Sequence, residues 1–300
     1  MQATVFAPAT CGEIVQGTFN DINMHITCPI NYYSKVTACR KGSPGVNIYP
    51  ENRYKAQRAS ELTLEYLNVN AGMEIIIESD IPVGKGMASS TADIAASAQA
   101  TALALGHYLS PHVISEIALA IEPSDGLFYP GIVAFDHVRG RYYQHLGNSV
   151  DLTIIAFDYG GEIDTIAFNK RPDLPKKNRD KEHIIRKAYS LVKQGLKGNN
   201  LKLIGEGASL SALANQTIIY KPYLEEIIEM ATKMGAYGVN TAHSGTLIGI
   251  FTKSQSPLSN SLTEEILKHF PFLELRGKFS LVNGGFAKEI RTKAAGEANP

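Results

Sequence analysis

Residues 82–92 have the sequence Pro82-Val83-Gly84-Lys85-Gly86-Met87-Ala88-Ser89-Ser90-Thr91-Ala92. They follow a strand-like segment, 73–78, and precede an alanine-rich helical segment, 89–105, that stops at Gly106. Small residues let backbone N–H groups approach an anion, and the start of a helix adds partial positive charge at the same point. These residues, called the glycine loop below, therefore predict a phosphate-binding site.

Two better-known glycine motifs do not fit this loop. A Walker A motif needs G-x-x-x-x-G-K-[ST], and the dinucleotide fingerprint needs a third glycine where Ser89 stands. An ordinary strand-to-helix turn capped by a serine remains an alternative. Ser89 and Ser90 have three open roles, as helix caps, as ligands of a phosphate oxygen, or as hydroxyl ligands of magnesium.

Composition favours a small-molecule partner. The 29 basic and 29 acidic side chains cancel, so the chain has no global field that would hold nucleic acid or an anionic membrane. The N-terminus lacks the pattern of a signal peptide, and no apolar run approaches the roughly 20 residues of a membrane span. The three cysteines, Cys11, Cys28 and Cys39, lack the spacing of a zinc or redox site, which favours reduced thiols in the cytoplasm.

The pattern along the chain predicts an α+β fold. Strands and helices alternate without the regular βαβ order of a doubly wound sheet. We expect strands at 3–7, 26–30, 33–39, 46–49, 73–78, 132–136, 142–145, 152–157, 246–251 and 279–282, and helices at 54–67, 89–105, 111–121, 180–196, 200–214, 222–234 and 262–269. A segment rich in Gly, Asp, Lys and Pro at 159–180 predicts the boundary between two domains, 1–158 and 159–300.

Two acidic residues follow the helix predicted at 111–121. Phosphoryl transfer needs a metal ion that bridges phosphates and a group that receives or orients the acceptor's proton, and Glu122 and Asp125 could divide these tasks. Structural roles are the alternatives. Asp125 suits the turn at 124–126, and Glu122 could be a solvated residue at a helix end, although its charge opposes the helix dipole there.

Three segments in one order resemble the GHMP kinases. The glycine loop is similar to the family's second motif, P-x-x-x-G-L-x-S-S-A-A, with Met87 in place of leucine and Thr91 in place of alanine. Residues 7–13, APATCGE, resemble the first motif, and residues 238–246, GVNTAHSGT, resemble the third, a turn that meets the phosphate loop. The resemblance spans about residues 3–290. It implies a ribosomal-protein-like N-terminal domain, a ferredoxin-like C-terminal domain and a substrate cleft between them.

The resemblance also implies a nucleotide and metal site for ATP and Mg²⁺. Ser90 and Glu122 would hold the metal ion, and Asp125 lies near the position of the family's catalytic aspartate, where homoserine kinases have an asparagine. Lys85 is a second catalytic candidate, because it could neutralise phosphate, although a lysine on such a loop is as often simply exposed. The expected nucleotide-binding residues are Pro82, Gly84, Lys85, Gly86, Met87, Ala88, Ser89, Ser90 and Thr91.

Within the family, residues 8–17, 28–29 and 122–125 are most similar to L-threonine kinases of cobalamin synthesis. The implied activity is ATP-dependent phosphorylation of L-threonine to O-phospho-L-threonine for the cobalamin nucleotide loop. A homoserine or serine kinase is the alternative among enzymes, and a non-catalytic nucleotide-binding sensor is the alternative of another class. The sequence leaves the oligomeric state open, with a dimer possible.

The expected acceptor site draws on the first and third motifs. Glu13 and Gln16 would face the substrate's ammonium group, unless they only satisfy turn N–H groups. We expect Cys11 to be a packing residue and not a nucleophile, and His243 to hydrogen-bond backbone or substrate and not to bind metal. The full set of expected acceptor residues is Thr10, Cys11, Glu13, Gln16, Asp125, His243, Ser244 and Gly245.

Overall fold

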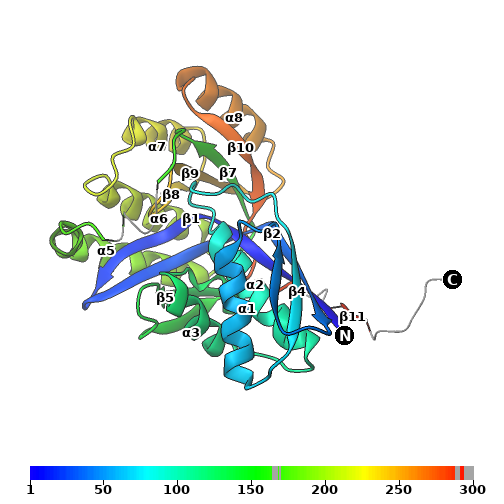
Figure 1. Cartoon of the computed structure of the whole chain (residues 1–300). Helices are drawn as coiled ribbons and strands as arrows, with labels where there is room; N and C mark the ends of the chain where they lie inside the picture. Colours follow the sequence, from blue (N-terminus) through cyan, green and yellow to red (C-terminus); the bar gives the residue numbers. More distant parts are fainter. Residues whose placement is uncertain (164–167, 169, 288–290, 294–300) are drawn as a thin grey trace.

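A computed structural model describes residues 1–163, 168 and 170–287, together with the backbone of 291–293. One 11-stranded sheet runs through both halves of the chain in the order β10-β7-β9-β8-β1-β2-β4-β3, while β11 pairs with β1, and β5 joins β2 to β6 (Figure 1). Among the described strands only β3 and β4 pair in parallel. The predicted α+β class is confirmed, because the sheet is mainly antiparallel and lacks repeated βαβ crossovers.

Two long antiparallel strands, β1 (Gln2–Phe19) and β2 (Ile22–Lys41), form the centre of the sheet. The sequence predicted only short pieces of each, since Pro8 and a run of small residues interrupt the alternation. The pairing bends at register shifts between Pro8 and Ala9 and on either side of Glu13. Bulges of this kind re-aim side chains next to functional sites, and here they place Glu13 at the junction of β1, β2 and β8.

The N-terminal half follows the predicted elements closely. After β3 (Gly45–Tyr49) come α1 (Tyr54–Leu67) and β4 (Gly72–Glu78), then α2 (Ser89–Ala104) and α3 (Pro111–Ile121). α2 packs on β1 and β2 and is buried on nearly every side. Its many alanines permit this close approach, which fixes the glycine loop against the sheet.

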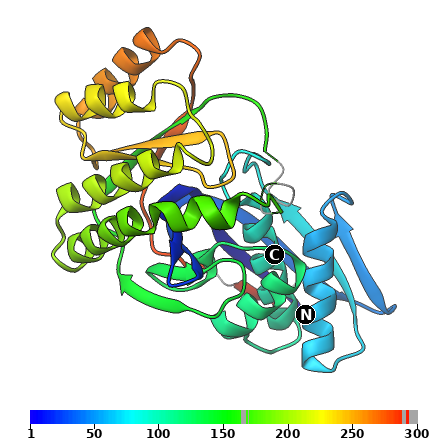
Figure 2. The same cartoon turned by 90° about the vertical axis from the view of Figure 1, so that its left-hand side faces the viewer.

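β5 (Ile132–Asp136) and β6 (Tyr143–Gly147) form a hairpin, close to the strands expected at 132–136 and 142–145. A short 3-10 helix, η1 (Gly126–Phe128), precedes them. The C-terminal helices cover one side of β1 and the β8–β9 pair (Figure 2). The remaining elements are β7 (Leu152–Asp158), α5 (Leu174–Lys197), α6 (Leu201–Asn215), α7 (Leu224–Lys233), β8 (Gly238–Thr241), β9 (Leu247–Lys253), α8 (Leu258–His269), β10 (Glu274–Ser280) and β11 (Arg291–Lys293).

Several expected bounds were wrong. β10 begins at Glu274 and ends at Ser280, whereas a strand was expected at 279–282, because β10 lies at a sheet edge and most of its side chains are exposed. β8 was missed, since residues 238–241 are short and carry little strand signal. α5 begins six residues before the expected start, at a proline-containing first turn that suits a helix N-terminus.

The proposed division into 1–158 and 159–300 remains a prediction. β7 precedes this boundary but pairs with β9 and β10, which follow it, and β11 returns to β1. Part of the expected linker, at 164–167 and 169, lies outside the described residues. None of the helices in the described part of the chain has the length and apolarity that a membrane span requires.

Candidate active site

The three motif segments converge on the glycine loop. The N–H groups of Thr10, Gly12 and Thr246 donate to the backbone carbonyls of Met87, Gly86 and Lys85, each at 3.1 Å. A Cβ on Gly245 would lie 2.3 Å from the Lys85 carbonyl oxygen, so only glycine permits this approach. The prediction that the third segment meets the phosphate loop is confirmed.

The start of α2 remains open to an anion. Ala88 occupies the position before the helix in the left-handed conformation, and no side chain caps the helix. Ser89 and Ser90 are the first two helical residues, so neither serves as the cap that the sequence allowed. The helix N-terminus therefore faces the cavity beside the loop with its backbone dipole uncompensated by a capping side chain.

A cavity of about 470 Å³ lies against the glycine loop. Seven of the nine expected nucleotide-binding residues line it, whereas Pro82 and Lys85 do not. The lining residues from other segments include Glu13, Lys55, Glu122, Asp125 and Ser244. The structure thus brings the loop, both acidic residues and parts of the first and third motifs into one cavity.

Glu122 ends α3 and turns its carboxylate toward the start of α2. Ser90 Oγ donates to one of its oxygens, and Lys55 Nζ lies 2.6 Å from the other. A hydroxyl and a carboxylate are hard oxygen ligands of the kind that Mg²⁺ prefers beside nucleotide phosphates. The donor set expected from the sequence, Ser90 and Glu122, therefore fits Mg²⁺.

Lys55 was missed from the sequence. It lies in the first turn of α1, a helix of mixed polarity in which a lysine gives no local signal of function. Its ammonium group lines the cavity and compensates the buried Glu122 carboxylate. Magnesium at Ser90 and Glu122 would compete with this ammonium group for the same carboxylate, leaving Lys55 free to contact phosphate.

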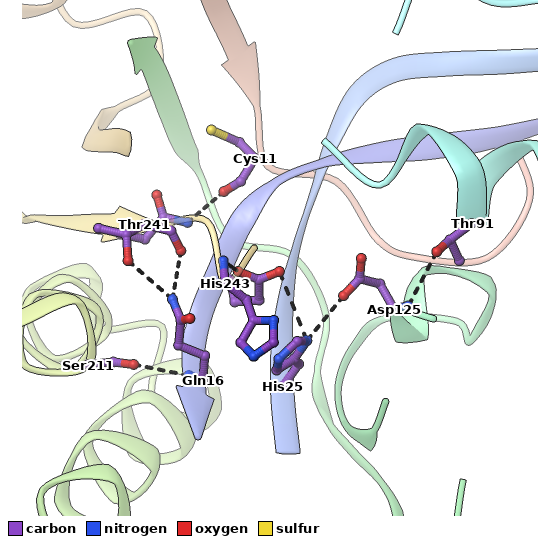
Figure 3. A network of polar contacts seen from close by, with 10 residues as sticks. Cys11, Gln16, His25, Thr91, Asp125, Ser211, Thr241 and His243 are labelled. Carbon is purple, nitrogen blue, oxygen red and sulfur yellow. Dashed lines mark hydrogen bonds and ion pairs between the residues drawn. The ribbon is translucent and has the colours of Figure 1, made fainter. Parts of the chain in front are cut away.

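Asp125 and Glu13 form a carboxylate pair around His25. His25 Nδ1 lies 3.2 Å from Asp125 Oδ1 and 3.9 Å from Glu13 Oε1 (Figure 3). Burial raises the pKa of both carboxyl groups, and for Glu13 the charge of Asp125 adds to the rise. The His243 N–H donates to Glu13 Oε2 at 2.6 Å, which orients this carboxylate.

Three histidine rings pack together beside this pair. His25 stacks on His137 with centroids 3.6 Å apart, and His243 contacts both rings edge-on. Burial lowers the pKa of His25 to about 3 and also lowers the pKa of the other two histidines. The three rings are therefore mainly neutral near pH 7. His25 Nδ1 lies within hydrogen-bond distance of Asp125, and the charge of His137 lowers the pKa of Asp125 by less than burial raises it.

Two buried lysines lie on the C-terminal side of this centre, and both were missed from the sequence. Lys221 donates to the Gly245 carbonyl at 3.3 Å, and Lys181 donates to Asn215 Oδ1 at 3.0 Å. Burial lowers the pKa of Lys221 to about 8 and that of Lys181 to about 7. The positive charge of Lys221 lowers the pKa of Glu13, against the effect of burial. The negative charge of Glu13 in turn offsets part of the lowering of the Lys221 pKa.

Some expected acceptor residues lie behind the cavity wall. Gln16 is buried, with Nε2 donating to the carbonyl and hydroxyl oxygens of Thr241. The Cys11 thiol is buried, and its pKa rises to about 12, chiefly through that burial, which suits packing and not nucleophilic attack. Thr10 and Gly245 also lie outside the cavity lining.

Lys85 points away from the cavity. Its ammonium lies 3.1 Å from Asp158 Oδ2 and 2.5 Å from the Gly161 carbonyl oxygen. A catalytic contact with phosphate would require Lys85 to leave this ion pair. Its catalytic role therefore remains a prediction, and among the described lysines it is Lys55 that lines the cavity.

Comparison with known proteins agrees with this geometry. A family sequence model described as GHMP kinases N terminal domain matches residues 54–128, and a second family model, GHMP kinases C terminal, matches residues 191–264. An L-threonine kinase of Salmonella typhimurium is 30% identical over 288 residues, covering 94% of each chain. The chain belongs to the GHMP kinases.

Two further similarities accord with membership of the GHMP kinases. An L-threonine kinase of Citrobacter freundii is 29% identical over 83% of this chain and 85% of its own. The crystal structure of a homoserine kinase from Cytophaga hutchinsonii shares the fold, with a TM-score of 0.72, 20% identity and coverage of 95% and 96%. The protein is therefore a small-molecule kinase with the two-domain GHMP kinase fold.

Proposed function

We propose that this GHMP kinase transfers the γ-phosphoryl group of ATP to the side-chain hydroxyl of a small amino acid, with L-threonine as the first candidate. The carboxylate pair Glu13 and Asp125 beside the glycine loop carries the proposal. Two relatives named L-threonine kinase, similar over most of the chain, support the same acceptor. O-phospho-L-threonine for the cobalamin nucleotide loop is the product proposed on this basis.

The nucleotide phosphates would lie against Gly84–Ser90 at the start of α2. Backbone N–H groups and the helix dipole would bind their negative charge there. Ser90 and Glu122 would hold Mg²⁺, which when bound neutralises charge on the β- and γ-phosphates. Lys55, released from Glu122, would add a positive charge on the same side of the cavity.

Asp125 would act on the acceptor hydroxyl. Its carboxylate would receive or orient the hydroxyl proton as the oxygen attacks the γ-phosphorus, the bond to the β-phosphate oxygen breaks, and ADP leaves. The neutral His25 ring holds Asp125 Oδ1 without neutralising it. The backbone N–H of Asp125 also lies 3.4 Å from Thr91 Oγ1, which ties the residue to the loop.

The charges around this centre suit a zwitterion. The Glu13 carboxylate lines the cavity and would pair with the ammonium group of the acceptor. The buried Lys221 lies behind the cavity wall, where its charge interacts with Glu13 and would favour an acceptor that also carries a carboxylate. Gln16 supports this wall through its bonds to Thr241 and does not contact the acceptor directly. These groups recognise the amino-acid end of the acceptor, which threonine, serine and homoserine share.

The test is ADP release with Mg²⁺ and ATP over L-threonine, L-serine, L-homoserine and ethanolamine. We expect L-threonine to give the highest kcat/KM and ethanolamine, which lacks a carboxylate, to be poor. Because a methyl or methylene group is worth about 1–3 kcal/mol in a pocket, the preference among the three amino acids should be roughly 10- to 200-fold. Nucleotide binding without ADP release for any acceptor would instead support a nucleotide-binding sensor.

A further inference from the structure

A second cavity, of about 570 Å³, adjoins the active site. Pro123, between Glu122 and Asp125 in the chain, lines both cavities. The second cavity, called the basic pocket below, is otherwise formed by the turn between β5 and β6, by residues 170–171 and the first two turns of α5, by the β1–β2 turn and the strand ends beside it, and by His243. It is therefore a separate space that begins where the active site ends.

The lining of the basic pocket has a large excess of positive charge. Its cationic residues are Arg139, Arg141, Lys170, Arg171 and Arg179, and its acidic residue is Asp21. Arg171 is paired with Asp173 at 2.7 Å, and Arg141 lies 3.7 Å from Asp136. Within the described part of the chain, Arg139, Lys170 and Arg179 have no acidic partner within ion-pair distance, and their side chains are exposed.

A buried histidine also opens into this pocket. His137 is only 6% exposed and lines the cavity, and its ring makes no hydrogen bond to another described residue. Its neighbour His243 lines the same cavity. An imidazole that lines the same cavity as these cations offers a further N–H donor to an anion.

The ligand that fits this pocket is strongly anionic. Three cations of the lining have no ion-pair partner among the described residues, and a ligand with a single carboxylate would pair with only one of them. Arginine guanidinium groups bind phosphate oxygens through two parallel hydrogen bonds, and the start of the 24-residue helix α5 lies in the same lining. We propose that the basic pocket binds an oxyanion with at least two negative charges, of the phosphate class.

Two sources could supply this chemistry, a distal anionic group of the acceptor or a separate small anion such as inorganic phosphate. Because the basic pocket adjoins the active site, a bound acceptor could extend into it, and a separate anion could also bind there. The proposal does not depend on which hydroxyl the kinase phosphorylates, so the binding experiment can succeed even if L-threonine proves not to be the acceptor.

Inorganic phosphate is the probe, measured by isothermal titration calorimetry on the whole protein. The glycine loop is first saturated with Mg²⁺ and a non-hydrolysable ATP analogue, so that phosphate cannot bind there. The test variant is R139A/R179A, which removes two exposed arginines of the pocket. The control is K176A/K187A, which removes two exposed positive charges of α5 that do not line the pocket.

We expect saturable binding to the wild type and to K176A/K187A, weakened by added salt, and an affinity at least about tenfold lower in R139A/R179A. Absence of saturable binding to the wild type at about 10 mM phosphate, a millimolar limit for weak sites, would overturn the proposal. Equal affinities in the two double variants would also overturn it, because the bound phosphate would then lie elsewhere.

Kinase assays distinguish the two sources. If the acceptor carries the anion, phosphate competes with the acceptor, and R139A/R179A raises the acceptor KM about tenfold or more while the ATP KM stays unchanged. If the anion is separate, phosphate does not compete with L-threonine, and the L-threonine KM is similar in R139A/R179A and K176A/K187A. Both results uphold the pocket as an anion site and differ only in what occupies it.

Discussion

Asp125 Oδ1 lies 3.2 Å from His25 Nδ1, and this contact joins a partly buried carboxylate to an imidazole that carries no charge near pH 7. A charged histidine would have lowered the pKa of Asp125. His25 is neutral, and burial outweighs the lowering effect of His137, so the pKa of Asp125 is raised. A carboxylate with a raised pKa is a stronger proton acceptor, which suits a residue that acts on the acceptor hydroxyl.

This relationship predicts the acidic limb of the pH profile. Asp125 accepts a proton only when ionised, and its raised pKa means that ionisation is lost at a higher pH than for an ordinary aspartate. We therefore expect kcat to fall on acidification at a pH where ordinary exposed aspartates are still ionised. The measurement is kcat from pH 5 to 9 at saturating ATP, Mg²⁺ and acceptor, roughly the range over which such groups titrate. A flat profile down to about pH 4.5 would mean that Asp125 has an ordinary aspartate pKa near 3.9 or does not act as a base.

The substitution Asp125→Asn keeps the size and turn preference of the residue but removes its charge. We expect turnover to fall by about 10²-fold or more with an unchanged ATP KM, for every accepted amino acid together. Asp151→Asn, at an exposed aspartate away from the cavity, is the matched control and should keep full activity. A loss confined to L-threonine would make Asp125 a specificity contact and not a proton acceptor.

Glu122→Gln tests the metal site. Removing the carboxylate ligand of this site weakens ion binding without opening the core, so we expect about a tenfold or greater rise in the Mg²⁺ concentration needed for half-maximal turnover, together with a lower kcat. Circular dichroism should show an intact fold. An unchanged Mg²⁺ titration would leave Glu122 only the role of partner to Lys55 and Ser90.

Lys55→Met separates the phosphate role of Lys55 from its structural role. If the ammonium group turns from Glu122 to phosphate when magnesium binds, Lys55→Met should raise the ATP KM and lower kcat, each by about tenfold, the value of one charged hydrogen bond. The control Lys176→Met changes an exposed lysine outside the cavity. Reduced thermal stability with normal kinetics would show that the Lys55–Glu122 ion pair is structural.

Local signals were enough to predict the part of the site formed by adjacent residues. The strand, small-residue loop and helix around 82–92 follow one another in the chain, and Glu122 ends a helix with a clear apolar face. His25, His137 and Lys221 could not be predicted in this way. Pairing of β2 with β5 brings His25 and His137 together across more than 100 residues, and Lys221 enters from a separate segment that precedes α7.

The contrast between local signals and tertiary pairing also explains why the sequence predicted only a short piece of β1. A short-range pattern does not predict a strand through Pro8 and Gly12, since proline cannot donate a hydrogen bond and glycine weakens a strand. The chain nevertheless continues as a strand because bulges accommodate these residues and because the facing segments of β2 and the glycine loop supply partners. The site therefore depends on tertiary pairings that the local sequence does not encode.

Gly86 offers a test of the contact between the glycine loop and the third motif. Its φ is +90°, and a Cβ there would lie 2.3 Å from the Ala242 Cβ, at the point where the two segments meet. Gly106 has a similar φ of +85° but has no atom within 4 Å of its Cβ position. Gly86→Ala and Gly106→Ala therefore share the backbone strain and differ in the steric conflict.

We expect Gly106→Ala to lose about 1–2 kcal/mol of unfolding free energy from the left-handed backbone alone. Gly86→Ala should lose about 1–3 kcal/mol more, because the third motif must move away from the loop. The same movement would displace Ser244 and the Glu13–His243 contact, so ATP and acceptor KM values should both rise in Gly86→Ala and stay normal in Gly106→Ala. Chemical denaturation and steady-state kinetics on the two variants measure these effects. Equal stability losses with normal kinetics in both would show that the loop and the third motif can separate without consequence, and the convergence of the three motifs would then not be required for catalysis.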